Sequence, residues 1–314
     1  MKMTRDKIER LAFVKYLLFQ AKSQKDLERP MSSSAILTIH DCVECFLQLC
    51  FEVITGQAKI SSKNILDTYS EEINKIHKEQ DKIQINKSFI KRINDQRNQL
   101  KHSTIFTDHN QIPNLYVETE MFLIDFTSLV FGISFDQVSL VELVTNEDIK
   151  RHLFDAQYSI QKKEYQKAMW SLGKAFYEIK NNRTKVEGKY GENLLRKPFN
   201  VDYLIKYRTG LGGSEPDKIL KENLKEIAED INKLQDEIQN IKITLSLAVD
   251  LNEYTYFKEH MPYVSKLVYP ETNEIKFWIP DEERKEERSY SFETVKFCFD
   301  FVIELALKNE KASA

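Results

Sequence analysis

Apolar side chains recur three and four residues apart in stretch after stretch of this chain, and this spacing restricts its fold more than any other feature. An α-helix turns about 100° per residue, so such a spacing gathers apolar residues on one face. The clearest case ends at Gly56 and comprises Ile36, Ile39, Val43, Phe46, Leu47, Cys50 and Ile54. With only 8 glycines and 7 prolines in 314 residues, a β-sandwich or barrel rich in tight turns is disfavoured. The sequence therefore predicts a mainly α-helical protein.

The first 140 residues are predicted to form a helical bundle. Five helices are expected, over about residues 4–24, 34–56, 61–79, 86–102 and 114–132. The third is more polar and is expected on the surface. The fifth is apolar on most sides, which indicates a central or interface helix. Capping residues at Thr145–Asp148 start a new helical segment, so the sequence predicts one domain over 1–140 and a second over 141–314.

The second domain is predicted to be mostly helical with a small β hairpin. Helices are expected over about 147–162, 164–181, 215–251 and 291–308. In the third of these, apolar residues repeat at threes and fours over several turns: Leu220, Leu224, Ile227, Ile231, Leu234, Ile238, Ile241 and Leu245. The hairpin is expected at about 263–280, where apolar and polar residues alternate on either side of Pro270–Asn273.

Composition and cysteine usage restrict the possible partners and the cellular compartment. The net charge of −3 gives no overall basic field, so any nucleic-acid contact needs a local patch. The start of the chain lacks the apolar core of a signal peptide, and no run of about 18 apolar residues appears, so no membrane span is predicted. Cys42, Cys45, Cys50 and Cys298 do not form a disulfide framework, which favours the cytoplasm. Because Cys42-x-x-Cys45 lacks a second ligand pair, neither a metal nor another cofactor is predicted.

The most unusual stretch is Arg97–His102, at the end of the helix predicted over 86–102. Arg97 continues an apolar stripe formed by Phe89, Ile93 and Leu100. A guanidinium in such a stripe is costly to bury unless it meets an anion or several acceptors. His102 can exchange a proton near neutral pH. An Arg for phosphate charge and a His for protons suggest phosphodiester chemistry.

The helical geometry, however, separates the two side chains. On an ideal helix Asp95, Asn98 and His102 share a polar face, whereas Arg97 projects from the apolar edge. The pair could therefore meet at one site only if the helix frays after Lys101 or if a second subunit brings its own copy. A plain alternative is a hydrogen-bonded Arg97–His102 pair that caps the helix.

The pattern Arg97-Asn98-x-x-x-His102, late in a bundle of about 140 residues, resembles the HEPN superfamily (higher eukaryotes and prokaryotes nucleotide-binding domain). The resemblance covers residues 1 to about 140. It implies a metal-independent endoribonuclease whose products carry 2′,3′-cyclic phosphate ends. The resemblance implies that His102 is the general acid or base, that Arg97 stabilises the phosphate, and that Asn98 orients His102 or the phosphate. Relatives with a Tyr two positions after the His are controlled by adenylylation, but Thr104 stands there in this chain.

The resemblance also implies partners: an RNA substrate, a second copy in a homodimer, and an antitoxin or phage-derived trigger, as in bacterial toxin–antitoxin and abortive-infection systems. Asp95, just before the motif, and Lys101, within it, are expected to support it. His40, Asp41 and Glu44 lie on the helix that is expected to face the motif, and one of these polar groups is a candidate partner for Arg97. A basic, tyrosine-interleaved stretch is a candidate RNA contact or, alternatively, an ordinary solvated surface; its basic residues include Arg183, Lys185, Lys189 and Arg196.

Two other functions stay open. In one, the bundle is a non-catalytic, HEPN-like dimerising module and the second domain recognises RNA or a protein. In the other, the chain is an antitoxin or regulator bound to a separate toxin. A guanidinium of Arg97 sealed inside one subunit by Asp41 or Glu44 would favour the non-catalytic reading.

Overall fold

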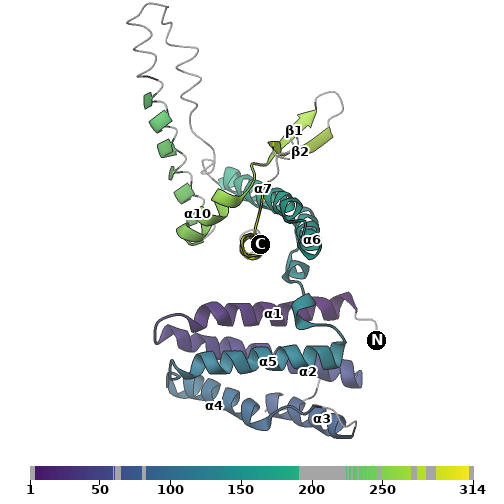
Figure 1. Cartoon of the computed structure of the whole chain (residues 1–314). Coiled ribbons are helices and arrows are strands. Elements are labelled where there is room, and N and C mark those ends of the chain that lie inside the picture. Colours follow the sequence, from purple (N-terminus) through teal and green to yellow (C-terminus); the bar gives the residue numbers. More distant parts are fainter. Residues whose placement is uncertain are drawn as a thin grey trace, which may run out of the picture. The chain divides into compact units, whose positions relative to one another are not determined.

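The computed structural model describes residues 4–58, 60, 65–79, 83–190, 249–269, 274–280 and 288–310, together with most of 224–245. The chain divides into two compact units, Met1–Leu143 and Val144–Ala314 (Figure 1). Helices dominate both units, and the described strands form one two-stranded antiparallel sheet. The prediction of a mainly α-helical fold with a small hairpin is confirmed.

Unit 1 is a bundle built around one central helix. Its long helices are α1 (Arg5–Lys25), α2 (Ser34–Thr55), α3 (Ile65–Glu79), α4 (Lys87–Ser103) and α5 (Gln111–Phe131). The apolar α2 contacts each of the other four, as its strong stripe predicts (Figure 1). Gly56 ends α2 with a left-handed backbone (φ 75°), and its N–H donates to the Glu52 carbonyl at 2.9 Å. A residue with a Cβ is strained at this φ, which explains a glycine here.

Two expectations for unit 1 are corrected by the structure. Helix α5 begins at Gln111 rather than near residue 114, because Pro113 lies in its first turn, where a missing N–H costs no helical hydrogen bond. Helix α3 is not simply a surface helix. Although its sequence is polar, one face of the helix is buried. The residues of this face are Leu66, Tyr69, Ser70, Ile73, Asn74 and His77.

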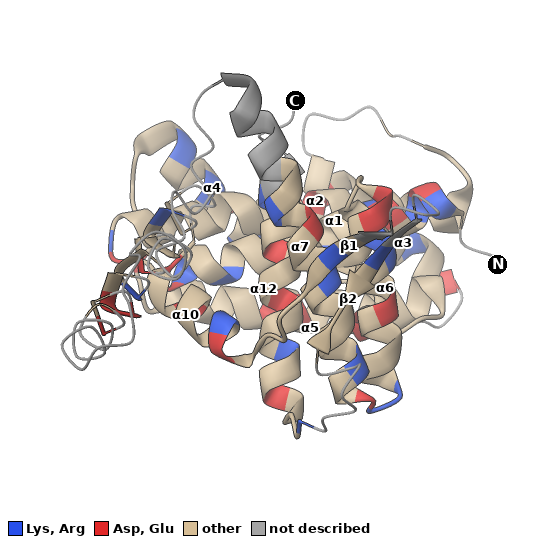
Figure 2. Cartoon of the chain, turned by 90° about the horizontal axis from the view of Figure 1, so that it is seen from above, with Lys and Arg blue, Asp and Glu red and all other residues tan. Residues whose placement is uncertain are grey.

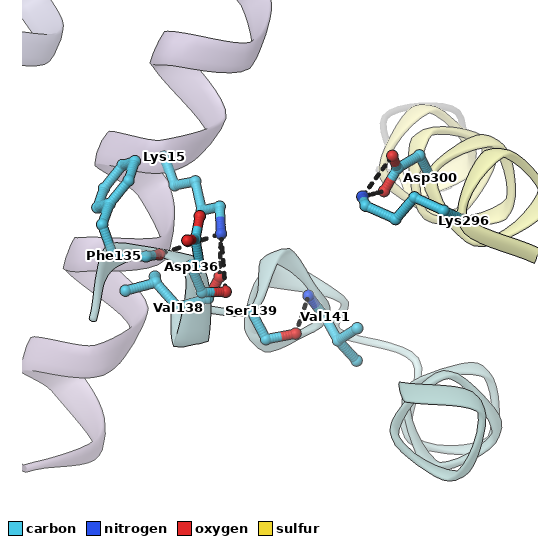
Figure 3. Close-up of polar contacts among 8 residues, drawn as sticks. All are labelled: Lys15, Phe135, Asp136, Val138, Ser139, Val141, Lys296 and Asp300. Atoms are coloured by element: carbon cyan, nitrogen blue, oxygen red, sulfur yellow. Dashed lines mark hydrogen bonds and ion pairs between the residues drawn. The ribbon is translucent and has the colours of Figure 1, made fainter. Parts of the chain in front are cut away.

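The C-terminal end of unit 1 is fastened to α1 by a lysine. After α5, the chain forms two short 3₁₀ helices, η2 (Phe135–Gln137) and η3 (Leu140–Leu143). Figure 3 shows the Lys15 ammonium reaching the carbonyls of this turn. Its Nζ donates to Phe135 O at 3.1 Å, Asp136 O at 3.3 Å and Val138 O at 2.7 Å. Three acceptors for one cation offset the cost of its partial burial and fix the exit of the chain.

One stretch of unit 1, Met31–Thr55, is long and apolar enough to cross a membrane by length and composition alone. It contains a short 3₁₀ helix, η1 (Met31–Ser33), and α2. In the structure 61% of its most apolar window is buried inside the protein. The central helix of a globular bundle has this property, so the stretch is weak evidence for a span. The absence of a membrane span stays a prediction.

Unit 2 is built on a helical hairpin, α6 (Glu147–Gln161) and α7 (Tyr165–Tyr190), against which α12 (Phe292–Glu310) packs. As its sequence predicts, Asn146 caps α6: its Oδ1 accepts from the N–H groups of Asp148 and Ile149, both at 3.1 Å. Within α12, Lys296 and Asp300 form an ion pair one turn apart (Figure 3). The described part of 224–245 is helical, whereas 215–223 lies outside the described residues.

The predicted hairpin is confirmed. Its strands β1 (Ser265–Tyr269) and β2 (Glu274–Trp278) pair antiparallel, with Ser265 opposite Trp278. The Phe277 ring meets His152 of α6 and Tyr177 of α7 edge-on. Just before β1, Val264 approaches α7 so closely that a Cβ on Gly173 would lie 2.6 Å from its Cγ2. The sheet is thus seated on the α6–α7 hairpin.

One helix of unit 2 was not predicted. Helix α10 (Leu251–His260) begins where the long helix was expected to end. Asp250 caps it, its Oδ1 accepting from Asn252 N at 2.8 Å and Glu253 N at 3.1 Å. An Asp in this role marks a helix start, but the apolar spacing continues through it and hides the break.

Candidate functional site

Helix α4, which carries the Arg97–His102 motif, is well defined at both ends. Asn86 caps its start, its Oδ1 accepting from Ser88 N at 2.9 Å. At its other end Thr104 adopts a left-handed backbone (φ 55°), and Ile105 N donates to Gln99 O at 3.1 Å. These bonds satisfy backbone groups that a helix end leaves unpaired. The helix therefore stays intact through Ser103, and the fraying after Lys101 that one route to the site required is not observed.

The buried face of α4 leads directly to Arg97. Phe89, Ile90 and Ile93 are buried, and Leu100 packs against the same core while partly exposed. Arg97 lies four residues after Ile93 and is half-buried. Its Nη1 donates to the neighbouring Asn98 Oδ1 at 3.2 Å. Among the residues that the structure describes, Arg97 has no carboxylate partner, so its charge is balanced by a neutral amide only.

His102 faces solvent on a different side of α4. Asp95, Asn98, Lys101 and His102 are all exposed, as the helical spacing predicts for a polar face. Five residues at about 100° each place Arg97 and His102 roughly 140° apart around the helix axis. No hydrogen bond joins Arg97 to His102 within the described chain, so the two do not form a capping pair. One copy of α4 therefore does not bring the guanidinium and the imidazole to a single point.

The carboxylates that were candidate partners for Arg97 lie against a histidine instead. On α2, His40 Nδ1 is 3.4 Å from Asp41 Oδ1 and 3.8 Å from Glu44 Oε2. His40 is buried, Glu44 is half-buried and Asp41 is exposed. Neither carboxylate pairs with Arg97 in the described structure. The expectation that α2 would neutralise the motif arginine is thus not met.

His40, Asp41 and Glu44 are also the described group best placed to hold a metal ion. One ligand atom from each lies within 4.8 Å of the others. An imidazole with two carboxylates suits zinc or manganese. The same geometry is equally that of a buried histidine hydrogen-bonded to the acid next to it on the helix surface. The arrangement therefore permits an ion without requiring one.

The cysteines of α2 lie in the apolar core or, for Cys45, against it. Cys42 is fully buried, and its Sγ donates to Val14 O at 3.3 Å. Burial raises the pKa of the Cys42 and Cys50 thiols far above their usual range, and it also raises the pKa of Cys45. In unit 2, burial raises the pKa of Cys298 to about 12. Protonated thiols are poor nucleophiles, and the burial of Cys42 and Cys50 agrees with the structural role predicted for them.

A surface hollow of about 550 Å³ between α4 and α5 was missed by the sequence analysis. Arg92 of α4 and Glu118 of α5 form an ion pair there. Gln96 Nε2 donates to Gln111 Oε1 at 3.0 Å beside it. The lining residues are Arg92, Gln96, Gln111, Asn114, Leu115, Val117 and Glu118. Arg92 and Gln96 are one turn apart, but nothing in this spacing says which helix they face. The motif residues are not part of the lining.

The basic stretch of α7 cannot be placed at a site. The backbone of Arg183, Lys185 and Lys189 belongs to α7, but their side chains, like Arg196 as a whole, lie outside what the structure describes. Elsewhere, basic and acidic residues are interspersed along the same helices (Figure 2). The RNA contacts predicted for this stretch stay a prediction.

Within the described structure, the site offered by these residues is thus a half-buried guanidinium without an acidic partner and an exposed imidazole five residues further along α4, on a different side of the helix. An arginine of this kind can receive a phosphate, and a histidine of this kind can exchange a proton with a ligand in solvent. Comparisons with protein-family models, with curated proteins and with solved structures return no match.

Proposed function

We propose that this chain is a metal-independent endoribonuclease of the HEPN type that acts as a bacterial toxin or anti-phage abortive-infection effector. One observation carries the proposal: Arg97 continues the buried stripe of α4, yet its described polar partner is only the neutral Asn98 amide. A half-buried cation is stabilised by an anion, and a phosphodiester supplies two oxygens that match the guanidinium fork.

The chemistry follows from the two side chains. His102 takes the proton of an RNA 2′-hydroxyl, whose oxygen then attacks the adjacent phosphorus. The bond from phosphorus to the 5′ oxygen breaks, leaving a 2′,3′-cyclic phosphate and a 5′-hydroxyl. The leaving oxygen receives its proton from water. Arg97 offsets the charge that grows on the phosphate oxygens, and Asn98 holds the guanidinium through their hydrogen bond.

A site shared by two copies of the chain fits the geometry of α4. Within one copy the helix holds Arg97 and His102 roughly 140° apart. A two-fold axis beside the C-terminal end of α4 would set Arg97 of one copy opposite His102 of the other. The partners of this proposal are therefore an RNA substrate and a second copy, with an antitoxin or a phage-derived trigger as the regulator and the cytoplasm as the setting.

The test compares purified wild type with Arg97→Ala and His102→Ala on single-stranded RNA in the presence of EDTA. Each substitution should lower the cleavage rate by about 10²–10⁴-fold, the range of one catalytic proton transfer or one charge-stabilising group. Wild-type products should carry 2′,3′-cyclic phosphate ends. The matched control is Lys91→Ala, which removes an exposed positive charge from the same helix and should keep cleavage near the wild-type rate. Equal cleavage by all four proteins, or none by wild type, would contradict the proposal.

A non-catalytic regulator or antitoxin is the second candidate. It is favoured by His102 itself, which has no hydrogen-bonding partner among the described residues to orient its ring. General bases are usually held by such a partner. If wild type binds RNA or a protein toxin without cutting, and Arg97→Ala weakens that binding while His102→Ala does not, this second function replaces the first.

A further inference from the structure

The described helical residues within 224–245 (below, the 224–245 helix) carry an apolar stripe that the rest of the described structure leaves largely uncovered. Five of its seven apolar positions are exposed: Ile227 by 54%, Leu234 by 58%, Ile238 by 52%, Ile241 by 48% and Leu245 by 76%. Leu224 and Ile231 complete the stripe and are partly buried. Exposed branched side chains in one continuous row are unusual on a monomer surface and mark an interaction site.

The spacing of the stripe identifies the kind of surface that covers it. Successive members are 3, 4, 3, 4, 3 and 4 residues apart from Leu224 to Leu245, a strict seven-residue repeat over three heptads. A straight helix drifts by about 20° per heptad from such a repeat, so the stripe would turn away from a flat core. A second helix that supercoils with it stays in contact throughout. The partner is therefore another α-helix.

The described polar contacts between this helix and the rest of unit 2 do not involve the apolar stripe. Near its C-terminal end, Asn240 Oδ1 accepts from Lys258 Nζ of α10 at 2.7 Å, and Thr244 is buried, its carbonyl accepting from Val249 N at 3.1 Å. Asn240 and Thr244 are on the flank of the helix, roughly 100° from the line joining Ile241 and Leu245. The anchor and the stripe thus occupy different faces.

The charges beside the stripe favour a second copy in a parallel arrangement. With Leu224, Ile231, Ile238 and Leu245 at the a positions, Glu237 falls at g and Lys242 at e. In a parallel, in-register pair, each Glu237 faces Lys242 of the other copy, which gives two attractive pairs. In an antiparallel pair of copies the g positions meet, and Asp230 would face Glu237 twice. The charges at these positions therefore attract each other in the parallel pair and repel each other in the antiparallel pair.

We propose that the 224–245 helix forms a parallel, in-register two-stranded coiled coil with the same helix of a second copy of this chain. This interface lies in unit 2 and does not depend on the nuclease activity proposed for α4. It tethers two copies through a surface that carries none of the motif residues.

Disulfide trapping of the full-length protein tests the pairing and its register together. In a parallel coiled coil the d positions of the two helices lie opposite each other, so Leu234→Cys should give a disulfide-linked dimer in a mildly oxidising glutathione buffer. Ile241→Cys, one heptad along, should do the same. Glu229→Cys, on the outer surface of the helix, is the control and should stay monomeric on a denaturing gel, as should wild type. Both d positions are exposed in the single chain, so the substitutions leave its fold in place.

A second pair of variants separates specific pairing from chance collision. Adding Leu234→Lys to the Ile241→Cys protein should reduce cross-linking at least tenfold, because it places two charges in the shared core. Adding Glu229→Lys, which changes charge on the outer face, should leave cross-linking unchanged. The proposal is overturned if neither d-position cysteine cross-links, as antiparallel or intrachain pairing predicts, or if Glu229→Cys links equally well. Either failure leaves the RNA-cleavage comparison of Arg97→Ala and His102→Ala unaffected.

Discussion

At the scale of single residues, the chain shows two ways of placing a histidine. His102 stands in solvent at the end of α4, where a ligand can reach it. His152 of α6 is only 7% exposed, and its Nε2 has no hydrogen-bonding partner in the described structure. Its ring lies edge-on against Phe277, with 5.1 Å between the ring centres. Sequence gives no way to tell the two apart, but only the first is suited to proton exchange with a substrate.

The surroundings of His152 predict a pH-dependent stability of unit 2. Burial lowers its pKa, and the charges of Arg151 and Lys174 lower it further against the opposing effect of Glu178 and Asp155. The unfolded chain, with a His pKa near 6.5, then binds more protons than the folded one as the pH falls. The contribution of the neutral His152 to the unfolding free energy is present in full above pH ~6.5 and is lost as the pH falls below it. The His152→Leu variant should therefore lose a few °C less in Tm than wild type between pH 7.5 and 5.5. Differential scanning calorimetry measures this, and plots of Tm against pH that run parallel for the two proteins would refute it.

At the scale of elements, the start of α4 depends on a buried asparagine of α3. Asn74 Nδ2 donates to Ile85 O at 2.9 Å, and Ile85 N donates to Asn74 Oδ1 at 2.6 Å. Asn74→Ala leaves the buried N–H and C=O groups of Ile85 without these hydrogen bonds and should lower the unfolding free energy by about 2–4 kcal/mol. The exposed cap variant Asn86→Ala should cost only ~1 kcal/mol. Urea unfolding ranks the two variants, and an equal or smaller loss for Asn74→Ala would show that this pair does not anchor the helix.

The elements also show which structural features can be predicted from residues close together in the sequence. The starts of α4, α6 and α12 were predictable because Asn86, Asn146 and Ser291 act on backbone groups two or three residues away. The buried face of α3 was missed because Asn74 and His77 are polar, and only the folded chain brings them against Ile85 and Ile83 after the helix and, for His77, against the Phe126 ring of α5. The same limit applies at the site. The separation of Arg97 and His102 follows from helical geometry, and so does the proximity of His40 to Glu44, four residues apart on α2. Whether Asp41 or Glu44 also reaches Arg97 depends on how α2 and α4 pack, which the sequence does not give.

At the scale of the whole molecule, the charge balance limits how the RNA substrate of the proposed function could be held. The net charge is −3, and acidic and basic residues are interspersed along the helices in Figure 2. Without an overall basic field, long-range steering of RNA is weak. Under the proposed function, the affinity for RNA would then come from a few local groups, with Arg97 as the first candidate. A two-copy assembly doubles the number of such groups on one particle and, with two tethered sites, raises the effective concentration of the second.

A site composed from two copies makes a quantitative prediction for mixed variants. In a dimer of one Arg97→Ala chain and one His102→Ala chain, one composite site loses both groups, and the other keeps an intact Arg97 and an intact His102. When equal amounts are mixed and subunits exchange, half of the dimers are mixed, so about a quarter of the wild-type cleavage rate should return. Each variant alone should stay inactive, and chains that are each Arg97→Ala and His102→Ala should give no rescue when added to either. If each site lies within one chain, mixing restores nothing. The rate of RNA cleavage before and after subunit exchange therefore decides between a shared site and a site in a single copy.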